Sequence, residues 1–131
     1  MPDFTVRYAK KSELERVNEI RYQVNRVHSN GRSDIFRDDF CDEMKNIVYK
    51  VFDGENSDVI VAVNGDTICG FATVEYIVKE KSPYGLQREF YQICEFGVDE
   101  YFRRMGVATK LINFCKQEAK NRGFDRLELD V

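Results

Sequence analysis

The chain has 131 residues, a mass of 15.4 kDa and a formal net charge of −3 at pH 7. Its length fits one domain over 1–131, and its 43% hydrophobic and 33% charged residues are typical of a folded globular protein. The net acidity argues against nucleic-acid or membrane-surface binding, and no apolar run has the length of a membrane span or a secretion signal, so we expect a cytoplasmic protein with neither partner.

The cysteines and the single histidine argue against a metal site. Cys41, Cys69, Cys94 and Cys115 lie far apart and form no C-x-x-C pair, which favours buried free thiols in a reducing compartment. His28 alone cannot build a histidine-rich centre. We therefore expect no bound metal.

The first elements in chain order are a short strand and a helix. Phe4–Tyr8 alternates weakly and predicts the strand, and Ser12 with Glu15 is typical of a capping box at the start of the helix. Apolar residues at steps of three and four give this helix one buried face, formed by Leu14, Val17, Ile20, Val24 and Val27. The stretch "HSNGRSD" predicts its end.

A second helix is predicted to begin at Asp38 or Asp39, either of which can cap it, and to end at "DGENSD". Its apolar face consists of Phe40, Met44, Ile47, Val48 and Val51. Two β-rich runs then flank Asn64-Gly65, a pair suited to the positive φ angles of a tight hairpin turn.

The remaining elements are a strand at about 90–98, a helix that ends near Arg122 with Gly123 as its C-cap, and a last strand in "FDRLELDV". The predicted order is β-α-α-β-β-β-α-β. This order indicates one α/β domain of the α+β type, with no internal repeat or linker.

The stretch "VDEYFRRMGVATKLI" leads from a strand into a helix through two arginines and a glycine. The first N–H groups of a helix lack intrahelical partners and attract phosphates. Gly106 and Ala108 leave the backbone open to close approach, and Arg103 and Arg104 add positive charge. The alternative is an ordinary turn with solvated arginines. Neither G-x-G-x-x-G nor G-x-x-x-x-G-K-[ST] occurs, so neither a dinucleotide-binding fold nor a nucleotide P-loop has support.

This stretch resembles the acetyl-coenzyme A signature of the GNAT N-acetyltransferase superfamily, [RQ]-x-x-G-x-[GA] at a helix start, met here by Arg103, Gly106 and Ala108. The likeness extends over essentially the whole chain and is best to small bacterial members. It implies a mixed, twisted sheet whose fourth and fifth strands splay apart around acetyl-CoA. The pyrophosphate would meet the backbone of 104–108 and the pantetheine arm the fourth strand. The residues so assigned to the cofactor are Phe96, Gly97, Val98, Arg103, Arg104, Met105, Gly106, Val107 and Ala108.

Acetyl transfer to an amine needs a proton acceptor, and Glu95 is the candidate. The resembling enzymes often place an acidic residue at this point of the fourth strand, facing the wedge. Strand parity puts Glu95, Gly97 and Asp99 on one face, although a bulge would change that parity. The alternative is that Glu95 is a solvent-facing or salt-bridged strand residue.

Five further residues are candidates for binding the acceptor. His28, Arg32 and Asp34 follow the first helix, and Tyr84 and Tyr91 lie near the fourth strand with polar ends suited to a pocket. Surface, capping and core roles are the alternatives for each of them.

The function predicted from these residues is direct transfer of an acetyl group from acetyl-CoA to a primary amine of a small molecule or protein, in a ternary complex. A non-catalytic CoA-binding module is the alternative, and a protein that binds another phosphate ligand is a weaker one. In the resembling family a further helix, with a tyrosine proposed as general acid, and a hairpin follow the fifth strand. Both are missing after Val131, so we expect a truncated chain or a homodimer that covers the fifth strand.

Overall fold

The computed structural model describes residues 3–31, 41–86 and 88–129, and of 26–31 it describes the backbone. The elements are β1 (Thr5–Tyr8), the 3-10 turn η1 (Lys11–Glu13), α1 (Leu14–Gly31), α2 (Asp42–Asp53), β2 (Ser57–Asn64), β3 (Thr67–Lys79), β4 (Arg88–Val98), the 3-10 turn η2 (Glu100–Phe102), α3 (Val107–Asn121) and β5 (Leu127–Leu129). The predicted order of strands and helices is confirmed.

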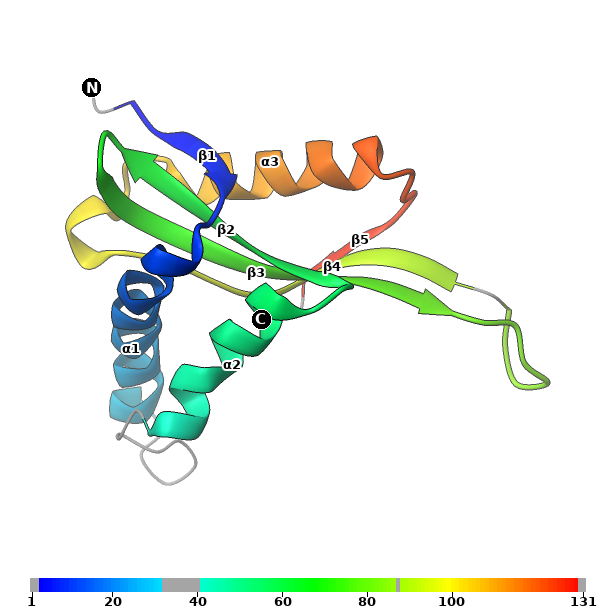
Figure 1. Cartoon of the computed structure of the whole chain (residues 1–131). Helices are drawn as coiled ribbons and strands as arrows, with labels where there is room; N and C mark the ends of the chain where they lie inside the picture. The colour runs from blue at the N-terminus through cyan, green and yellow to red at the C-terminus, as the bar shows by residue number, and fades with distance from the viewer. Residues whose placement is uncertain (1–2, 32–40, 87, 130–131) are drawn as a thin grey trace.

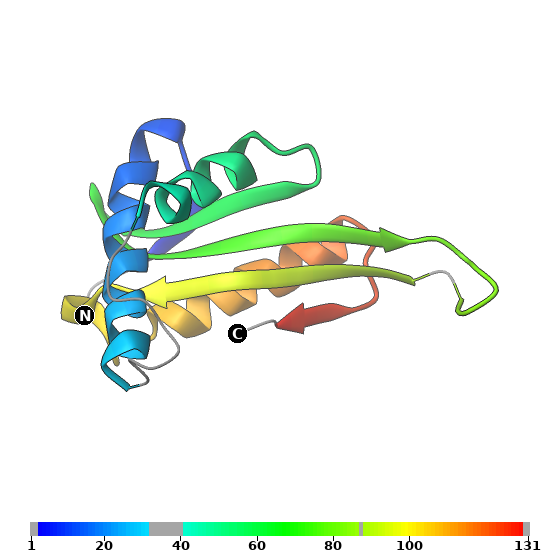
Figure 2. The same cartoon turned by 90° about the horizontal axis from the view of Figure 1, so that it is seen from below.

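The strands form one mixed sheet in the order β1-β2-β3-β4-β5. Neighbouring strands from β1 to β4 are antiparallel, whereas β5 runs parallel to β4. Helices α1 and α2 cover one face of the sheet and α3 covers the other (Figure 1). The sheet twists between these two layers of helices (Figure 2).

Two apolar clusters fill the space between the sheet and its helices. The cluster under α3 contains Ile60, Ala72 and Ile93 together with inward residues of α3. The cluster under α1 and α2 contains alternate strand residues and part of the predicted helix faces, with Leu14, Val17, Ile20 and Val48 all fully buried. Ile47, which was predicted on the apolar face of the second helix, is instead 44% exposed. Period-two alternation along the strands therefore serves both cores at once.

Two predicted helix starts are wrong by a few residues. The carboxylate that closes the first cap belongs to Glu13, which accepts the Lys10 N–H at 2.8 Å, and not to Glu15. Glu13 also pairs with Arg7 of β1, which explains why it replaces Glu15 in this role. The second helix begins at Asp42 with Cys41 as its N-cap, and the predicted caps at positions 38 and 39 lie outside the described residues.

The hairpin between β2 and β3 turns one residue later than predicted. Asn64 pairs with Thr67, so Gly65 and Asp66 are the central residues of the turn. Gly65 has a φ of 61°, and no other residue of this turn has a positive φ. A tight hairpin turn needs a positive φ, and glycine at the first central position supplies it, so Asn64 does not have to adopt the left-handed conformation.

The β3–β4 hairpin extends beyond the rest of the sheet as a two-stranded arm (Figure 2). The β2 pairing of β3 stops at Glu75, and β5 begins its pairing with β4 only at Tyr91. No helix in the described part of the chain is long and apolar enough to cross a membrane.

Candidate functional site

The edge of β4 opens at the point where the sheet was expected to splay. β5 pairs only with Tyr91–Ile93, and Cys94 then forms a bulge, since Val74 pairs with Ile93 while Thr73 pairs with Glu95. Among the described residues, 95–98 pair with β3 alone. Within the described part of the chain, one backbone edge of β4 therefore has no strand partner over this stretch.

The bulge determines which side chains face which helix layer. Phe96 and Val98 pack against the cluster under α3, as Ile93 does before the bulge. On the other face, a Cβ atom at Gly97 would lie 2.8 Å from Val24 Cγ2 of α1, so only glycine lets α1 approach β4 here. After the bulge, even-numbered residues of β4 face α3 and odd-numbered ones face α1, as predicted for Glu95 and Gly97. Before Cys94 the two sets exchange faces, so that Ile93 packs under α3.

The turn after β4 is shaped by two positive φ angles. Arg104 has a φ of 65° and Gly106, the N-cap of α3, has a φ of 86°. A Cβ atom at Gly106 would meet nothing within 4 Å, so this position is open to approach from outside the chain. Arg103, Arg104 and Met105 are exposed around it, whereas Val107 is buried and faces Gly70 of β3.

The backbone N–H groups at the start of α3 are potential hydrogen-bond donors to a ligand. The first α3 bond runs from the Lys110 N–H to the Gly106 carbonyl at 3.1 Å. Within the described part of the chain, no backbone hydrogen bond of good geometry is donated by the N–H groups of 104–108. Together with the positive end of the α3 dipole and two exposed arginines, they can bind a multiply charged anion.

The entry to the turn is fixed by Asp99, whose side chain is almost fully buried. Its carboxylate accepts the Tyr101 N–H at 2.9 Å, Arg16 Nη2 at 2.6 Å and Gln23 Nε2 at 3.1 Å. Burial alone would raise the pKa of Asp99, but the hydrogen bonds from Tyr101, Arg16 and Gln23 together lower it below its usual value. Sequence reasoning placed Asp99 on the correct face and missed this cluster.

Glu95 points toward α1 and is held there by a buried arginine. Arg21 Nη2 lies 3.3 Å from Glu95 Oε1, and Arg21 Nη1 donates to Asn18 Oδ1 at 2.8 Å and to the Met44 carbonyl at 2.6 Å. The Arg21 side chain is 5% exposed, whereas that of Glu95 is 41% exposed. Glu95 is thus salt-bridged, as the alternative interpretation expected, and still accessible to a ligand.

Of the five predicted acceptor residues, the structure describes the side chains of Tyr84 and Tyr91, and it does not bring these two together. Tyr91 is wrongly assigned, because it is fully buried against Tyr76 and Phe124 and cannot line an open pocket. Tyr84 is 98% exposed near the tip of the β3–β4 arm, where it lines a small hollow that does not include Glu95. The predicted residues Arg32 and Asp34 and the side chain of His28 lie outside the described residues.

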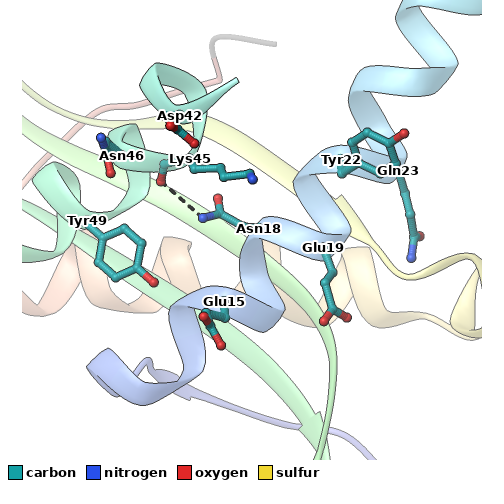
Figure 3. A pocket seen from close by; sticks show the side chains of 9 residues that line it. All are labelled: Glu15, Asn18, Glu19, Tyr22, Gln23, Asp42, Lys45, Asn46 and Tyr49. Carbon is teal, nitrogen blue, oxygen red and sulfur yellow. Dashed lines mark hydrogen bonds between the residues drawn. The ribbon is translucent and has the colours of Figure 1, made fainter. Parts of the chain in front are cut away.

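A wide hollow lies between α1 and α2, and none of the predicted site residues is among the residues that line it. It is an open groove of about 1020 Å³ into which carboxylate, amide and tyrosine side chains project (Figure 3). Its lining residues are Glu15, Asn18, Glu19, Tyr22, Gln23, Asp42, Lys45, Asn46 and Tyr49. Asn18 Nδ2 donates to the Lys45 carbonyl at 3.1 Å and so joins the two helices.

The sequence matches the acetyltransferase (GNAT) family over residues 8–131. Among solved structures, a mutant of the BH1408 protein from Bacillus halodurans is 26% identical with a TM-score of 0.89, over 97% of this chain and 82% of that one. An acetyltransferase from Vibrio fischeri is 24% identical with a TM-score of 0.78, over 97% and 95% of the two chains.

A third similar structure contains a ligand. The aminoglycoside N-acetyltransferase AAC(6′)-Iy in complex with CoA is 17% identical with a TM-score of 0.74, over 100% of this chain and 78% of that one. No curated protein matches the sequence.

Proposed function

The chain belongs to the GNAT family of acetyltransferases, and we propose that it transfers the acetyl group of acetyl-CoA directly to a primary amine of a small molecule or protein. The observation that carries this proposal is the turn at 103–108, where backbone donors without partners surround an open glycine. Acetyl-CoA supplies the activated acetyl group. The protein supplies its binding, its orientation and the removal of a proton from the amine.

The turn has the positive charge and the open space that the pyrophosphate of the cofactor needs. The N–H groups of 104–108 supply donors, and Arg103 and Arg104 supply formal charge at an exposed position. Gly106 leaves room for a phosphate against the backbone. Anions bind readily at such helix starts because donors and dipole act together.

The unpaired edge of β4 suits the pantetheine arm. Amide groups of an extended ligand can hydrogen-bond to an open strand edge as another strand would. The stretch Phe96–Val98 offers such an edge directly before the turn, so one ligand can use both features. This placement brings the thioester toward the bulge and Glu95.

We assign Glu95 the role of proton acceptor. In the reaction the neutral amine attacks the thioester carbonyl, the C–N bond forms, the C–S bond breaks and CoA leaves as the thiolate. The amine proton passes to the Glu95 carboxylate, which Arg21 orients and which is accessible from outside. A proton for the thiolate must come from another source, to which we assign no residue of this chain.

The proposal is tested first by ligand-induced thermal stabilisation. We expect acetyl-CoA and CoA to raise the temperature of the unfolding midpoint, and ATP and NAD to leave it unchanged. A ligand that binds only the folded state stabilises that state, and the stabilisation increases with the ratio of ligand concentration to Kd. Stabilisation by ATP and NAD but not by CoA would overturn the proposal in favour of another phosphate ligand.

A thiol-release assay with a panel of amines then separates the enzyme from a binding module. Release of CoA that depends on one class of amine supports transfer and identifies the acceptor. Binding of acetyl-CoA without release by any amine would support the non-catalytic alternative. A homodimer in which a second copy pairs with the edge strand β5 remains a prediction for the same preparation, to be measured by sedimentation.

A further inference from the structure

We propose that Asp99 is a positioning residue for the cofactor: its carboxylate, held by Arg16 and Gln23 of α1, sets the backbone donors of 104–108 in the geometry that binds the pyrophosphate. This inference rests on the proposed function, because it assigns the origin of the turn's shape to residues that do not touch the ligand.

The two oxygens of Asp99 act in different directions. Oδ1 accepts the Tyr101 N–H within the turn at 2.9 Å, whereas Oδ2 accepts Arg16 Nη2 at 2.6 Å and Gln23 Nε2 at 3.1 Å across the gap to α1. Gln23 returns a second contact, since its Oε1 accepts the Glu100 N–H at 3.0 Å. The start of the turn is therefore tied to one side of α1 at three points.

The backbone of Asp99 is fixed as firmly as its side chain. Its N–H donates to the Cys69 carbonyl of β3 at 2.7 Å, and its carbonyl accepts the Phe102 N–H at 2.9 Å. Arg16 also donates to the Ile68 carbonyl at 3.3 Å, so the arginine is held by β3 while it holds Asp99. Asp99 is thus the junction of α1, β3 and the turn.

The tip of the turn has almost no support of its own. Across 103–106, the one side-chain hydrogen bond among the described residues runs from Arg103 Nε to the Val98 carbonyl at 3.5 Å. Arg104 nevertheless holds a positive φ, a conformation that is unfavourable for a non-glycine residue and persists only where neighbouring structure enforces it. The enforcement comes from the two ends, which are Asp99 at the entry and buried Val107 at the exit.

A purely structural role for Asp99 gives a different expectation. A buried charged cluster that only stabilises the fold would affect cofactor binding no more than any other ion pair that anchors α1. Such a pair exists, because Arg7 and Glu13 join β1 to the start of α1 with two contacts of 2.8 Å. Glu13→Gln is therefore a matched control that removes an ion pair next to the start of α1 without touching the turn or the residues that hold it.

The test compares CoA affinity by calorimetry in the wild type, Asp99→Asn, Gln23→Ala, Arg16→Met, Arg16→Lys and Glu13→Gln, at a temperature where each is folded. We expect Asp99→Asn and Arg16→Met to weaken CoA binding by roughly tenfold and Gln23→Ala by less, because a charge-assisted contact is stronger than a neutral one. Arg16→Lys should recover much of the loss by restoring the charge. Glu13→Gln should bind CoA as the wild type does.

Hydrogen exchange supplies a local readout on the same samples. We expect the amides of 103–108 to exchange faster in Asp99→Asn, while the buried amides of α1 keep their protection. Gln23→Ala, which removes only one arm of the cluster, keeps the test valid where Asp99→Asn is too unstable to purify.

Three results would overturn the inference. Wild-type and Asp99→Asn affinities within twofold of each other would remove Asp99 from the cofactor site and leave the proposed function intact. An equal loss of CoA affinity in Glu13→Gln would show that the effect of Asp99→Asn comes from a general loss of stability and not from the turn. A wild type that does not bind CoA would overturn the inference and the proposed function together.

Discussion

At the residue scale, the arginines of the turn differ in how the backbone presents them. Arg103 lies in extended conformation and contacts the Val98 carbonyl, whereas Arg104 occupies the left-handed region at the outer part of the turn. Both side chains are exposed, so each can add charge to the site but neither shapes it.

We expect Arg103→Ala to weaken CoA binding by about three- to tenfold, and Arg104→Ala by less, because exposed charges contribute modestly and the backbone donors remain. Calorimetry of both variants measures the difference. Equal and complete loss in both would mean that side-chain charge, rather than the backbone of the turn, binds the phosphates.

In the proposed mechanism, removal of the amine proton depends on Glu95. We expect Glu95→Gln to keep CoA affinity and to lower turnover by about a hundredfold with a changed pH profile, since amide cannot accept the amine proton. Glu128→Gln on the neighbouring strand is the control, and its carboxylate pairs only with Arg126 among the described residues. A pH profile in Glu95→Gln identical to that of the wild type would limit Glu95 to its ion pair with Arg21.

At the element scale, α1 connects the two halves of the candidate site. It carries Arg21, which orients Glu95, and also Arg16 and Gln23, which share another side of the helix and hold Asp99. Its start is anchored separately, through Glu13 and Arg7. Residues of α1 therefore contact both Glu95 and the entry to the turn at 103–108.

The anchor of α1 gives a prediction for acid stability. The hydrogen bonds from Arg7 lower the pKa of Glu13 from 4.5 to about 2, assisted by the Lys10 N–H and opposed by burial. In the unfolded chain the carboxyl protonates near its usual pKa, so its stabilising effect is complete above that value and is lost as the pH falls toward about 2.

Glu13→Gln should reduce the free energy of unfolding by about 1 kcal/mol at about pH 7 and by progressively less toward about pH 3, since the pair is partly solvent-screened. Denaturant titrations of both proteins across this range measure the difference. A difference that does not change with pH would show that the ionised carboxylate of Glu13 adds nothing to the stability of the fold.

At the scale of the whole molecule, the features that sequence predicted well are those encoded by burial. The buried face of α1, with Leu14, Val17 and Ile20, was predictable because apolar residues recur there at the helical repeat. The buried sides of β2 and β3 were predictable in the same way from the apolar residues of these strands. The signature turn was predictable because its function requires particular residues close together in sequence.

The features that sequence predicted badly depend on contacts between distant segments. Arg16 and Gln23 meet Asp99 across 83 and 76 residues of chain, and no local pattern signals such a meeting. Tyr91 was placed in a pocket because its hydroxyl is polar, but the bulge at Cys94 turns it under α3. The cap before α1 was predicted with the wrong carboxylate for a related reason, since Glu13 pairs with Arg7 of β1.

The central claim is that acetyl-CoA binds with its pyrophosphate against Gly106. Calorimetric titration of acetyl-CoA into the wild type, Gly106→Glu and Gly123→Glu tests it directly. Gly123 ends the same helix with a φ of 84° against 86° at Gly106, and a Cβ atom at either position meets nothing within 4 Å, so backbone strain is matched. We predict that Gly106→Glu abolishes binding by placing bulk and negative charge where the phosphates lie, while Gly123→Glu binds as the wild type does. Unchanged affinity in Gly106→Glu would contradict the account.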